Sequence, residues 1–356
     1  MRILFTGARA PVTLELVRNF GANGWEVYVA DSMKNGLAQF SNQVTAFLNV
    51  SAPRFHETDF VNDLIRIINE NKIDVLFPTC EEIFWISKNK TRILENCHVN
   101  IICDDIEKLS LLHNKYRFIQ FAKSENLSTP ETHILHAGEH FDQMSVIKPI
   151  FSRFGAKVII TDDPKKVSIT DEVCEQYIIQ EFIEGESVCS YGYAVDGVLM
   201  FNICYQSPFR AKTFTAFQPF QSEAVNEMVR TIVEKLNFTG NISFDFIRKE
   251  DTYFLIECNP RITSGIHTLR HNRFEELFFD SVREPVCKPA QLFFPTLASS
   301  FRLVTYEDVI WNGKDIKPFL NQIRCLMSFH SIAKKQKISL TEAMTYDIEW
   351  NGNGIE

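Results

Sequence analysis

Two short runs of residues near position 250 constrain this chain more than any other part of its sequence. Residues 242–247 and 253–261 both alternate apolar and polar side chains, which is the pattern of half-buried strands. The polar residues 249–252 between them predict a turn. The three segments together predict an antiparallel β-hairpin.

The predicted hairpin brings two carboxylates together. With the turn centred on Asp251, Asp245 and Glu257 lie equally far from it, so we expect them opposite each other on one face, with Asn259 one pleat further along. Opposed carboxylates between apolar neighbours repel, and one must give up its charge unless a cation lies between them. The hairpin therefore predicts a metal site.

The ligands of this site would all be hard oxygen atoms, which favours magnesium or manganese over zinc. Magnesium in such sites is usually shared with substrate phosphates. Arg261, just after Pro260, would bring a fixed positive fork to the same phosphates. In the alternative interpretation, Asp245 faces solvent and Arg261 merely pairs with it.

The bulk properties narrow the class of protein. The 356 residues, 45% hydrophobic and 23% charged, are typical of a globular protein with two or three domains. A net charge of −8 argues against a nucleic-acid partner, and no apolar stretch is long enough to span a membrane. Nine cysteines without a C-x-x-C pair indicate reduced thiols, so we expect a cytoplasmic protein.

The first hundred residues alternate predicted strands and helices. We expect strands at 2–6, 25–30, 73–77 and 99–103 and helices at 11–23, 59–71 and 82–94. This order predicts an open, parallel, doubly wound sheet. Residues 7–11 supply one glycine where the dinucleotide signature has three, which leaves a nicotinamide cofactor as a second interpretation.

Ligands of such sheets bind at the carboxyl ends of the strands. Two segments qualify: the turn after the first strand, which contains Arg9, and residues 78–82 after the third. Glu81 and Glu82 could hold a substrate ammonium group. Alternatively, they form the acidic first turn of the next helix, which the helix dipole favours.

Four features follow in order: a lysine on a predicted helix at 107–126 (Lys115), a lysine at the end of a strand (Lys148), a loop at 150–155, and a buried strand at 177–183. With the open α/β domain before them and the hairpin after them, these features resemble the ATP-grasp superfamily of carboxylate–amine ligases. Taken singly, the two lysines would be solvated surface residues. The order of the six features is what carries the resemblance, over roughly residues 1–270.

The resemblance implies an α/β fold. An N-terminal open parallel α/β domain, called preATP-grasp, would occupy residues 1–106, and a two-subdomain α+β ATP-grasp fold would follow. We expect the small subdomain with its phosphate loop at 107–183 and the large subdomain with the metal hairpin at 184–290. A C-terminal extension at 291–356, with an amphipathic helix at 316–337, would pack on the ATP-grasp domain or on a second copy in a homodimer.

The resemblance also implies how ATP is bound. Phosphates would contact Lys115 and Lys148 beneath the loop residues Ser152 and Gly155. Adenine would lie on a hinge made of Gln180, Glu181, Phe182 and Ile183. Ribose would bind Glu186, with Glu181 as a stand-in, because relatives often place this glutamate where the chain has Ser187. The loop has fewer glycines and serines than is usual in the family.

The metal and phosphoryl-transfer roles fall on the hairpin. Asp245 and Glu257 would hold two Mg²⁺ ions, or Mn²⁺, with Asn259 on the second ion. Asp245 stands where several branches carry Gln or Glu, and its shorter side chain would hold the first ion through water. Arg261, Lys148 and Arg210 would act on the transferred phosphoryl group.

The reaction implied is ATP-dependent joining of a small carboxylic acid, such as an amino acid, to an amine through an acyl phosphate. One alternative within the fold phosphorylates or carboxylates a small molecule, as carbamoyl-phosphate and purine-pathway relatives do. A second is a non-catalytic ATP-binding module. The substrates would lie near Ser264 and Gly265, whose amides could face an anion, and His267 would be either a base or a structural residue.

Overall fold

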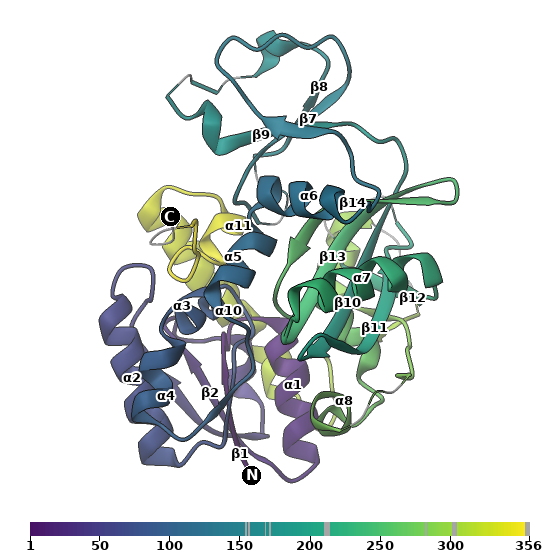
Figure 1. Ribbon diagram of the computed structural model, residues 1–356. Coiled ribbons are helices and arrows are strands. Elements are labelled where there is room, and N and C mark those ends of the chain that lie inside the picture. The colour runs from purple at the N-terminus through teal and green to yellow at the C-terminus, as the bar shows by residue number, and fades with distance from the viewer. Residues whose placement is uncertain are drawn as a thin grey trace.

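The computed structural model describes residues 1–352 apart from 154, 156, 168, 171, 210–213, 281, 283 and 301–304. Figure 1 shows the N-terminal domain at the bottom, a small sheet at the top and a large sheet on the right, with the C-terminal segment against the left side. The mixed α/β fold, with its parallel N-terminal sheet and two further sheets, confirms the predicted fold class. None of the described helices has the length and apolarity needed to cross a membrane.

The N-terminal domain is a five-stranded parallel sheet with strand order β3-β2-β1-β4-β5. Its strands are β1 (Arg2–Thr6), β2 (Glu26–Asp31), β3 (Val44–Asn49), β4 (Val75–Phe77) and β5 (Asn100–Ile101). Its helices are α1 (Pro11–Ala22), the 3₁₀ helix η1 (Leu37–Phe40), α2 (Glu57–Asn71), α3 (Glu82–Lys88) and α4 (Lys90–Asn96). The sequence missed β3, and the helix expected at 82–94 is divided at Asn89.

The helix expected at 107–126 is also divided, into α5 (Ile106–His113) and α6 (Lys115–Ser124). Asn114 causes the break, because its side chain accepts a hydrogen bond from the Arg117 amide and caps α6. Lys115 is therefore the first residue of a new helix. This helix lies over the hairpin, with Phe118 stacked 5.9 Å from Phe244.

The small subdomain is a four-stranded antiparallel sheet, ordered β6-β9-β7-β8. Its elements are β6 (Thr132–Ile134), β7 (Ser145–Pro149), β8 (Ile159–Thr161), η2 (Pro164–Lys166), η3 (Cys174–Gln176) and β9 (Tyr177–Glu181). It has a small core of its own around Leu135, Ile147 and Ile179. The loop between β7 and β8 is the predicted phosphate loop.

The large subdomain is a seven-stranded sheet, ordered β14-β13-β10-β11-β12-β15-β16. Its strands are β10 (Glu186–Val195), β11 (Val198–Gln206), β12 (Ala216–Phe220), β13 (Gly240–Lys249), β14 (Thr252–Asn259), β15 (Ala290–Gln291) and β16 (Glu307–Asp308). Its helices are α7 (Glu223–Leu236), η4 (Ser264–Leu269), α8 (Phe274–Phe279) and α9 (Phe293–Ser300). Phe278 packs on Phe77 and Tyr193, so this subdomain shares a buried aromatic core with the N-terminal sheet.

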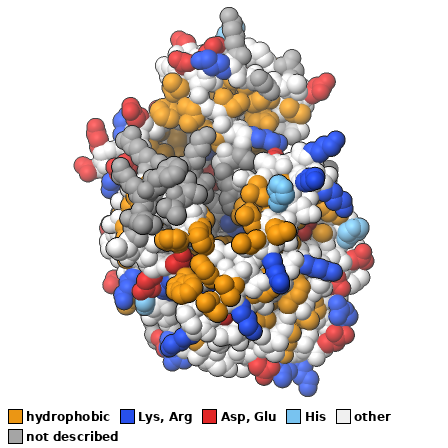
Figure 2. Space-filling model, turned by 180° about the vertical axis from the view of Figure 1, so that it is seen from behind, with side chains coloured by type: hydrophobic (Ala, Val, Ile, Leu, Met, Phe, Trp, Pro, Cys, Tyr) orange, Lys and Arg blue, Asp and Glu red, His pale blue; other side chains and the backbone are white. Residues whose placement is uncertain are grey.

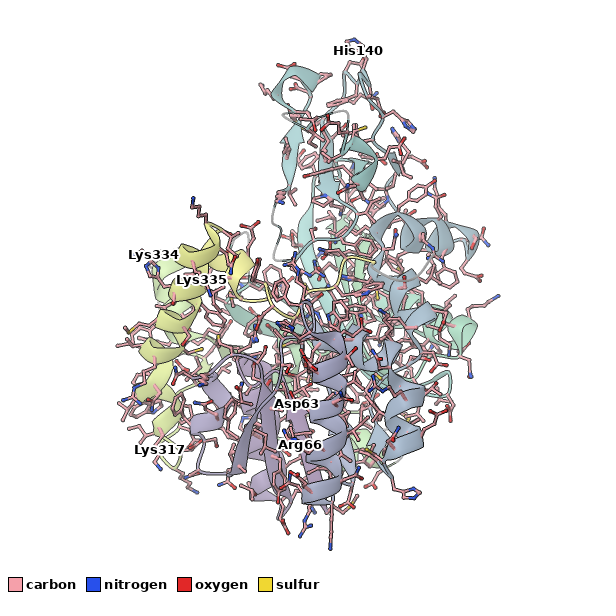
Figure 3. All side chains as sticks on the ribbon, turned by 90° about the vertical axis from the view of Figure 1, so that its left-hand side faces the viewer. Asp63, Arg66, His140, Lys317, Lys334 and Lys335 are labelled. Atoms are coloured by element: carbon pink, nitrogen blue, oxygen red, sulfur yellow. The ribbon has the colours of Figure 1, made fainter. Side chains whose placement is uncertain are left out.

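The C-terminal segment contains α10 (Lys317–Gln336) and α11 (Leu340–Ala343), which begins with a capping box of Ser339 and Glu342. Figure 3 shows α10 lying along one side of the molecule between Lys317 and Lys334. We expected this segment on the ATP-grasp domain or on a second copy. Its described residues contact the N-terminal domain, where the Trp85 indole donates to the Ile348 carbonyl at 2.9 Å, and also the loop after β7, where Arg153 donates to the Trp350 carbonyl.

The outer face of α10 is apolar. Phe329 is buried, but Ile323 and Leu326 are 69% and 53% exposed. Neighbouring Leu320 and Met327 are 63% and 65% exposed. Figure 2 shows apolar side chains gathered on this rear face. The expected homodimer stays a prediction.

Candidate active site

A cavity of about 540 Å³ lies where the carboxyl ends of β1 and β4, the small subdomain and the β13–β14 hairpin meet. Of the predicted site residues, it is lined by Arg9, Glu81, Lys148, Ser152, Gly155, Gln180, Glu181, Phe182, Ile183, Asp245, Glu257, Asn259, Arg261 and Ser264. Lys115 lies behind Glu257, and Glu82, Glu186, Gly265 and His267 are not part of the wall. Arg210 lies outside the described residues.

The hairpin pairs Asp245 with Glu257, although the turn is not where we placed it. The turn is the two residues after Lys249, which pairs with Thr252, and this register alone would set Asp245 opposite Ile256. A β-bulge adds Ile256 to β14 and restores the pairing of the two carboxylates. The bulge also turns the Ile256 carbonyl toward Lys148, whose ammonium donates to it at 3.5 Å.

The two carboxylates have pKa values shifted in opposite directions. Burial and the charge of Glu257 raise the pKa of Asp245. Burial would also raise the pKa of Glu257, but Lys115, 3.5 Å from it, and Lys148 lower it. Burial, together with the charge of Lys115, lowers the pKa of Lys148 to about 8. The site therefore holds buried ionisable groups whose pKa values are shifted by burial and by one another, and a bound cation or anion would reduce the repulsion between like charges.

This donor set fits a divalent metal ion. Asp245, Glu257 and Asn259 offer oxygen ligands on one face, and burial together with the charge of Glu257 raises the pKa of Asp245, which a bound cation would offset. Among the described residues, no three His, Cys, Asp or Glu side chains cluster into a self-sufficient site. A hard ion here would therefore share its coordination with a ligand such as phosphate, as magnesium does.

A buried carboxylate links the hairpin to the phosphate loop. Glu81 accepts from Arg261 at 3.0 Å and from Arg153 at 2.7 Å, and its side chain is 1% exposed. Burial would raise the pKa of Glu81, but Arg153, His113 and Arg261 hold it well below its ordinary value. Glu81 therefore orients two guanidinium groups and is not available for a substrate ammonium.

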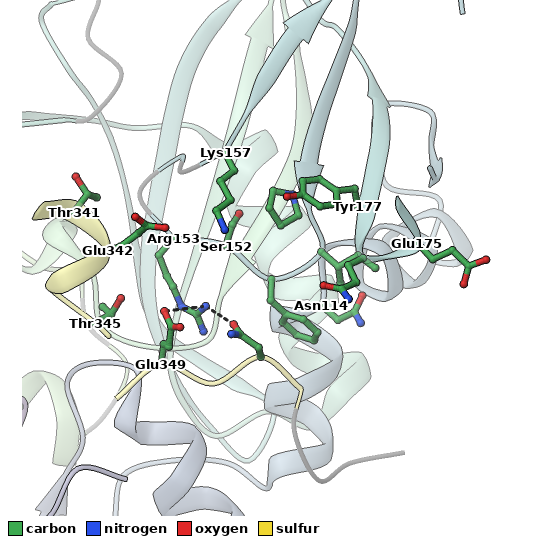
Figure 4. Close-up of a pocket in the computed structure, with 15 residues that line it drawn as sticks. Asn114, Ser152, Arg153, Lys157, Glu175, Tyr177, Thr341, Glu342, Thr345 and Glu349 are labelled. Atoms are coloured by element: carbon green, nitrogen blue, oxygen red, sulfur yellow. Dashed lines mark hydrogen bonds and ion pairs between the residues drawn. The ribbon is translucent and has the colours of Figure 1, made fainter. Parts of the chain in front are cut away.

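Arg153 also joins the loop to the C-terminal segment. It donates to the Trp350 carbonyl and to Asn351 Oδ1 at 2.6 Å. Figure 4 shows Arg153 beside Glu349 in a second hollow, of about 400 Å³, which Ser152 and Lys157 also line. The ring of Trp350, fully buried, stacks on Phe84 at 5.0 Å.

Arg9 and Glu82 are committed to partners within the protein. The Arg9 guanidinium contacts Asp31 at 2.5 Å and Asp347 at 2.6 Å. Glu82 Oε1 accepts from the Thr6 hydroxyl at 2.6 Å and from two backbone amides, while burial raises the pKa of its carboxyl group. Glu82 thus belongs to the first turn of α3, as the alternative interpretation held.

The predicted hinge residues line the cavity, whereas Glu186 does not. Residues 180–183 line the cavity, and Gln180 is fixed by its donation to the Thr132 hydroxyl at 2.9 Å. Glu186 is exposed and pairs with Arg248, whereas its neighbour Ser187 lines the wall. Strand alternation turns Glu186 away from the wall, which leaves Glu181 as the carboxylate at the hinge.

The residues after Arg261 serve packing more than binding. Gly265 lies so close to Tyr191 that an added Cβ would be 2.4 Å from the tyrosine Cβ. His267 is buried, 3.1 Å from Glu15, and burial lowers its pKa. Of the three predicted residues here, only Ser264 faces the cavity.

Thiol chemistry finds no support in the cavity. Cys80 and Cys189 line it, but burial and neighbouring carboxylates, Glu82 for Cys80 and Asp245 for Cys189, raise the pKa of both thiols. A protonated thiol is a poor nucleophile. The carboxylates, lysines and arginines are the groups left to act.

Sequence reasoning missed Arg153 and Asp347 as parts of the site. Arg153 carried a weak signal, since it is a charged residue in a loop where the family has glycine and serine. Asp347 carried none, because its partner Arg9 is 338 residues away. Only the folded chain shows that both belong to the charged network.

A family model matches the part of the chain that carries most of this site. Residues 112–265 match the model described as an ATP-grasp domain. The chain therefore contains an ATP-grasp domain over these residues.

Two curated relatives come from Methanocaldococcus jannaschii: an uncharacterized protein, 24% identical over 235 residues, and tyramine–L-glutamate ligase, 26% identical over 223 residues. The alignments cover 63% and 61% of this chain but 59% and 65% of the relatives, less than two thirds of each.

Solved structures share the fold. N5-carboxyaminoimidazole synthetase from Staphylococcus aureus, complexed with ADP, has a TM-score of 0.63 at 14% identity over 81% of this chain and 80% of its own. L-amino acid ligase from Bacillus licheniformis has a TM-score of 0.61 at 15% identity over 80% and 74%. At these identities the likeness shows the fold alone.

Proposed function

We propose that this chain is an ATP-dependent ligase that joins a small carboxylic acid, such as an amino acid, to an amine and releases ADP and phosphate. The observation that carries the proposal is the shared cavity of the hinge, the opposed pair Asp245 and Glu257, and the cations Lys148 and Arg261. The relative named tyramine–L-glutamate ligase joins an amine to an amino acid and so supports this class.

In this proposal ATP spans the cavity from the hinge to Arg261. Adenine lies on residues 180–183, and Lys148 and Arg261 face the phosphates. Asp245, Glu257 and Asn259 would hold Mg²⁺, which supplies charge neutralisation between the phosphate oxygens when bound. Glu81 fixes the angle of Arg261, so the guanidinium is oriented before substrate arrives.

The chemistry follows from this positioning. A substrate carboxylate oxygen attacks the γ-phosphorus, the bond to the β–γ bridging oxygen breaks, and ADP leaves. The amine then attacks the acyl carbon of the acyl phosphate, and phosphate departs with the former carboxylate oxygen. The departing phosphate can take the amine proton, so no protein base is required. The loop at Ser152 and Arg153 shields the acyl phosphate from water.

The test is a phosphate-release screen with Mg·ATP and amino acids supplied in pairs, followed by mass spectrometry of the products. Acid-dependent and amine-dependent release with an amide product supports the proposal. Release that depends on bicarbonate would favour a carboxylating or phosphorylating enzyme. ADP binding without phosphate release from any pair would favour a non-catalytic module.

We also propose two magnesium ions, from the resemblance and the oxygen ligands of the hairpin, and a cytoplasmic location, from the reduced cysteines. A homodimer would cover the apolar outer face of α10, where Ile323 is exposed.

A further inference from the structure

The cavity has two apolar ends with the charged cluster between them. The hinge end belongs to the small subdomain and the start of β10. The other end, which we call the apolar end, is built from four separate parts of the chain: α1, β11–β12, α10 and the residue after α11. Its walls are Val12, Tyr205, Phe214, Phe217, Phe329 and Met344.

The apolar end is one continuous surface. Four of its residues, Val12, Tyr205, Phe217 and Phe329, belong to a single buried cluster, and the remaining two pack against that cluster. The Tyr205 ring meets Phe214 and Phe217 edge-on, at 6.3 and 6.0 Å between centroids. This arrangement favours an apolar or aromatic group in contact with the wall.

Two of the charged groups beside this end, Arg9 and Glu81, are already paired within the protein. Arg9 is held by Asp31 and Asp347, and Glu81 is held by Arg153 and Arg261. The other described polar side chains nearby, on Thr79, Thr263 and Thr345, are uncharged hydroxyls. The six described residues that form the apolar end carry no charge themselves, so burying a charged substrate side chain against them would be costly.

We propose that the apolar end binds the side chain of the carboxylate substrate, and that this side chain is uncharged and of branched aliphatic or aromatic size. The proposal rests on the proposed function, because Arg261 marks where the reacting carboxylate lies. Ile262 and Thr263 follow Arg261 directly along the cavity wall, so the apolar end begins beside the reacting group.

Binding is tested apart from turnover. The protein with Mg·ADP bound is titrated calorimetrically with four amino acids of different side chain: phenylalanine, leucine, glutamate and lysine. We expect phenylalanine or leucine to bind at least tenfold more tightly than glutamate or lysine. Equal or tighter binding of a charged amino acid, or no binding by any of the four, overturns the proposal.

Substitutions at Met344 locate the binding site. Met344→Lys places a charge in the wall and should weaken phenylalanine binding at least tenfold, whereas Met344→Leu should retain it. Leu340→Lys is the matched control, because Leu340 is 42% exposed on α11 and lies outside the cavity wall. Unchanged ADP affinity in all three variants shows that they fold. Wild-type phenylalanine affinity in Met344→Lys overturns the proposal.

The same experiments separate this inference from the ligase itself. If Met344→Lys abolishes phenylalanine binding but no acid and amine cause phosphate release, the apolar site is supported and the ligase activity is refuted. Phosphate release with glutamate as the only effective acid sustains the ligase and removes the apolar site.

Discussion

Glu81 and Glu82 provide the sharpest test of the electrostatics described above, because both are buried but their carboxylates have opposite electrostatic surroundings. Glu81 is held between two arginines, whereas Glu82 has one oxygen satisfied by neutral donors and the other, Oε2, without a hydrogen-bond partner. Removing one partner of a buried ion pair costs about 3–5 kcal/mol, since the opposite charge is left unpaired. We expect Glu81→Gln to lose about 3 kcal/mol or more of unfolding free energy.

Glu82→Gln is the matched control. Burial raises the pKa of Glu82, and a glutamine keeps the accepting oxygen at the place of Oε1, so the change should cost less than about 1 kcal/mol. The assay is urea unfolding of both variants at pH 7. Equal costs, or a larger cost for Glu82→Gln, would refute the assignment of the two environments.

The pH dependence of the same variants has opposite signs. Because folding lowers the pKa of Glu81, the stability it contributes is present above the unfolded pKa and disappears as pH falls, so the deficit of Glu81→Gln should shrink in acid. Because folding raises the pKa of Glu82, its ionisation costs stability as pH rises. The unfolding free energy of Glu82→Gln should therefore rise relative to that of the wild type as the pH increases.

Three further changes test other parts of the network. Asp245→Asn removes the repulsion with Glu257, so the unfolding free energy of the nucleotide-free protein should rise by about 1 kcal/mol. Mg·ADP should no longer raise the melting temperature of this variant. Differential scanning fluorimetry measures both effects, with Asp251→Asn in the turn as the control. Burial lowers the pKa of His113 to about 3, so between pH 7 and pH 5 the wild type should lose about 2 kcal/mol more than His113→Gln, because only the unfolded state gains the proton. Asp347→Asn should cost about 3 kcal/mol in urea unfolding, since Arg9 loses a buried partner.

Each of these has a contradicting result. A nucleotide-free Asp245→Asn protein that melts below the wild type would show that the two carboxylates do not repel. Parallel pH profiles for the wild type and His113→Gln would place His113 in a polar environment. Wild-type stability of Asp347→Asn would mean that Asp31 alone satisfies Arg9.

Much of the site could be predicted from local sequence patterns. The alternation of β13 and β14 brought Asp245 opposite Glu257, but by a reasoning that omitted the bulge at Ile256, since a bulge leaves no mark in the alternation. The edge strand β3 was missed because most of its side chains, such as Phe47, are only partly buried and give no strong apolar run. Asn114 divided a predicted helix because its cap competes with helix continuation.

Partners distant along the chain could not be predicted in this way. Glu81 resembles the acidic first turn of a helix, and nothing local reveals that Arg153 and Arg261 meet it from 72 and 180 residues away. Ile323 and Leu326 have helical spacing, yet they lie outside, because α10 packs through Cys325, Phe329 and Ala333. Periodicity identifies the helix but not its neighbours.

The attachment of residues 347–351 has a consequence for synthesis. During translation, Arg9 and Arg153 leave the ribosome roughly two hundred residues or more before their C-terminal acceptors, Asp347 and the Trp350 carbonyl. A nascent chain therefore carries two guanidinium groups that have yet to meet their final acceptors. Cells that shorten this message near its 3′ end would make a protein whose loop keeps the Arg153–Glu81 pair but loses its acceptors in the C-terminal segment.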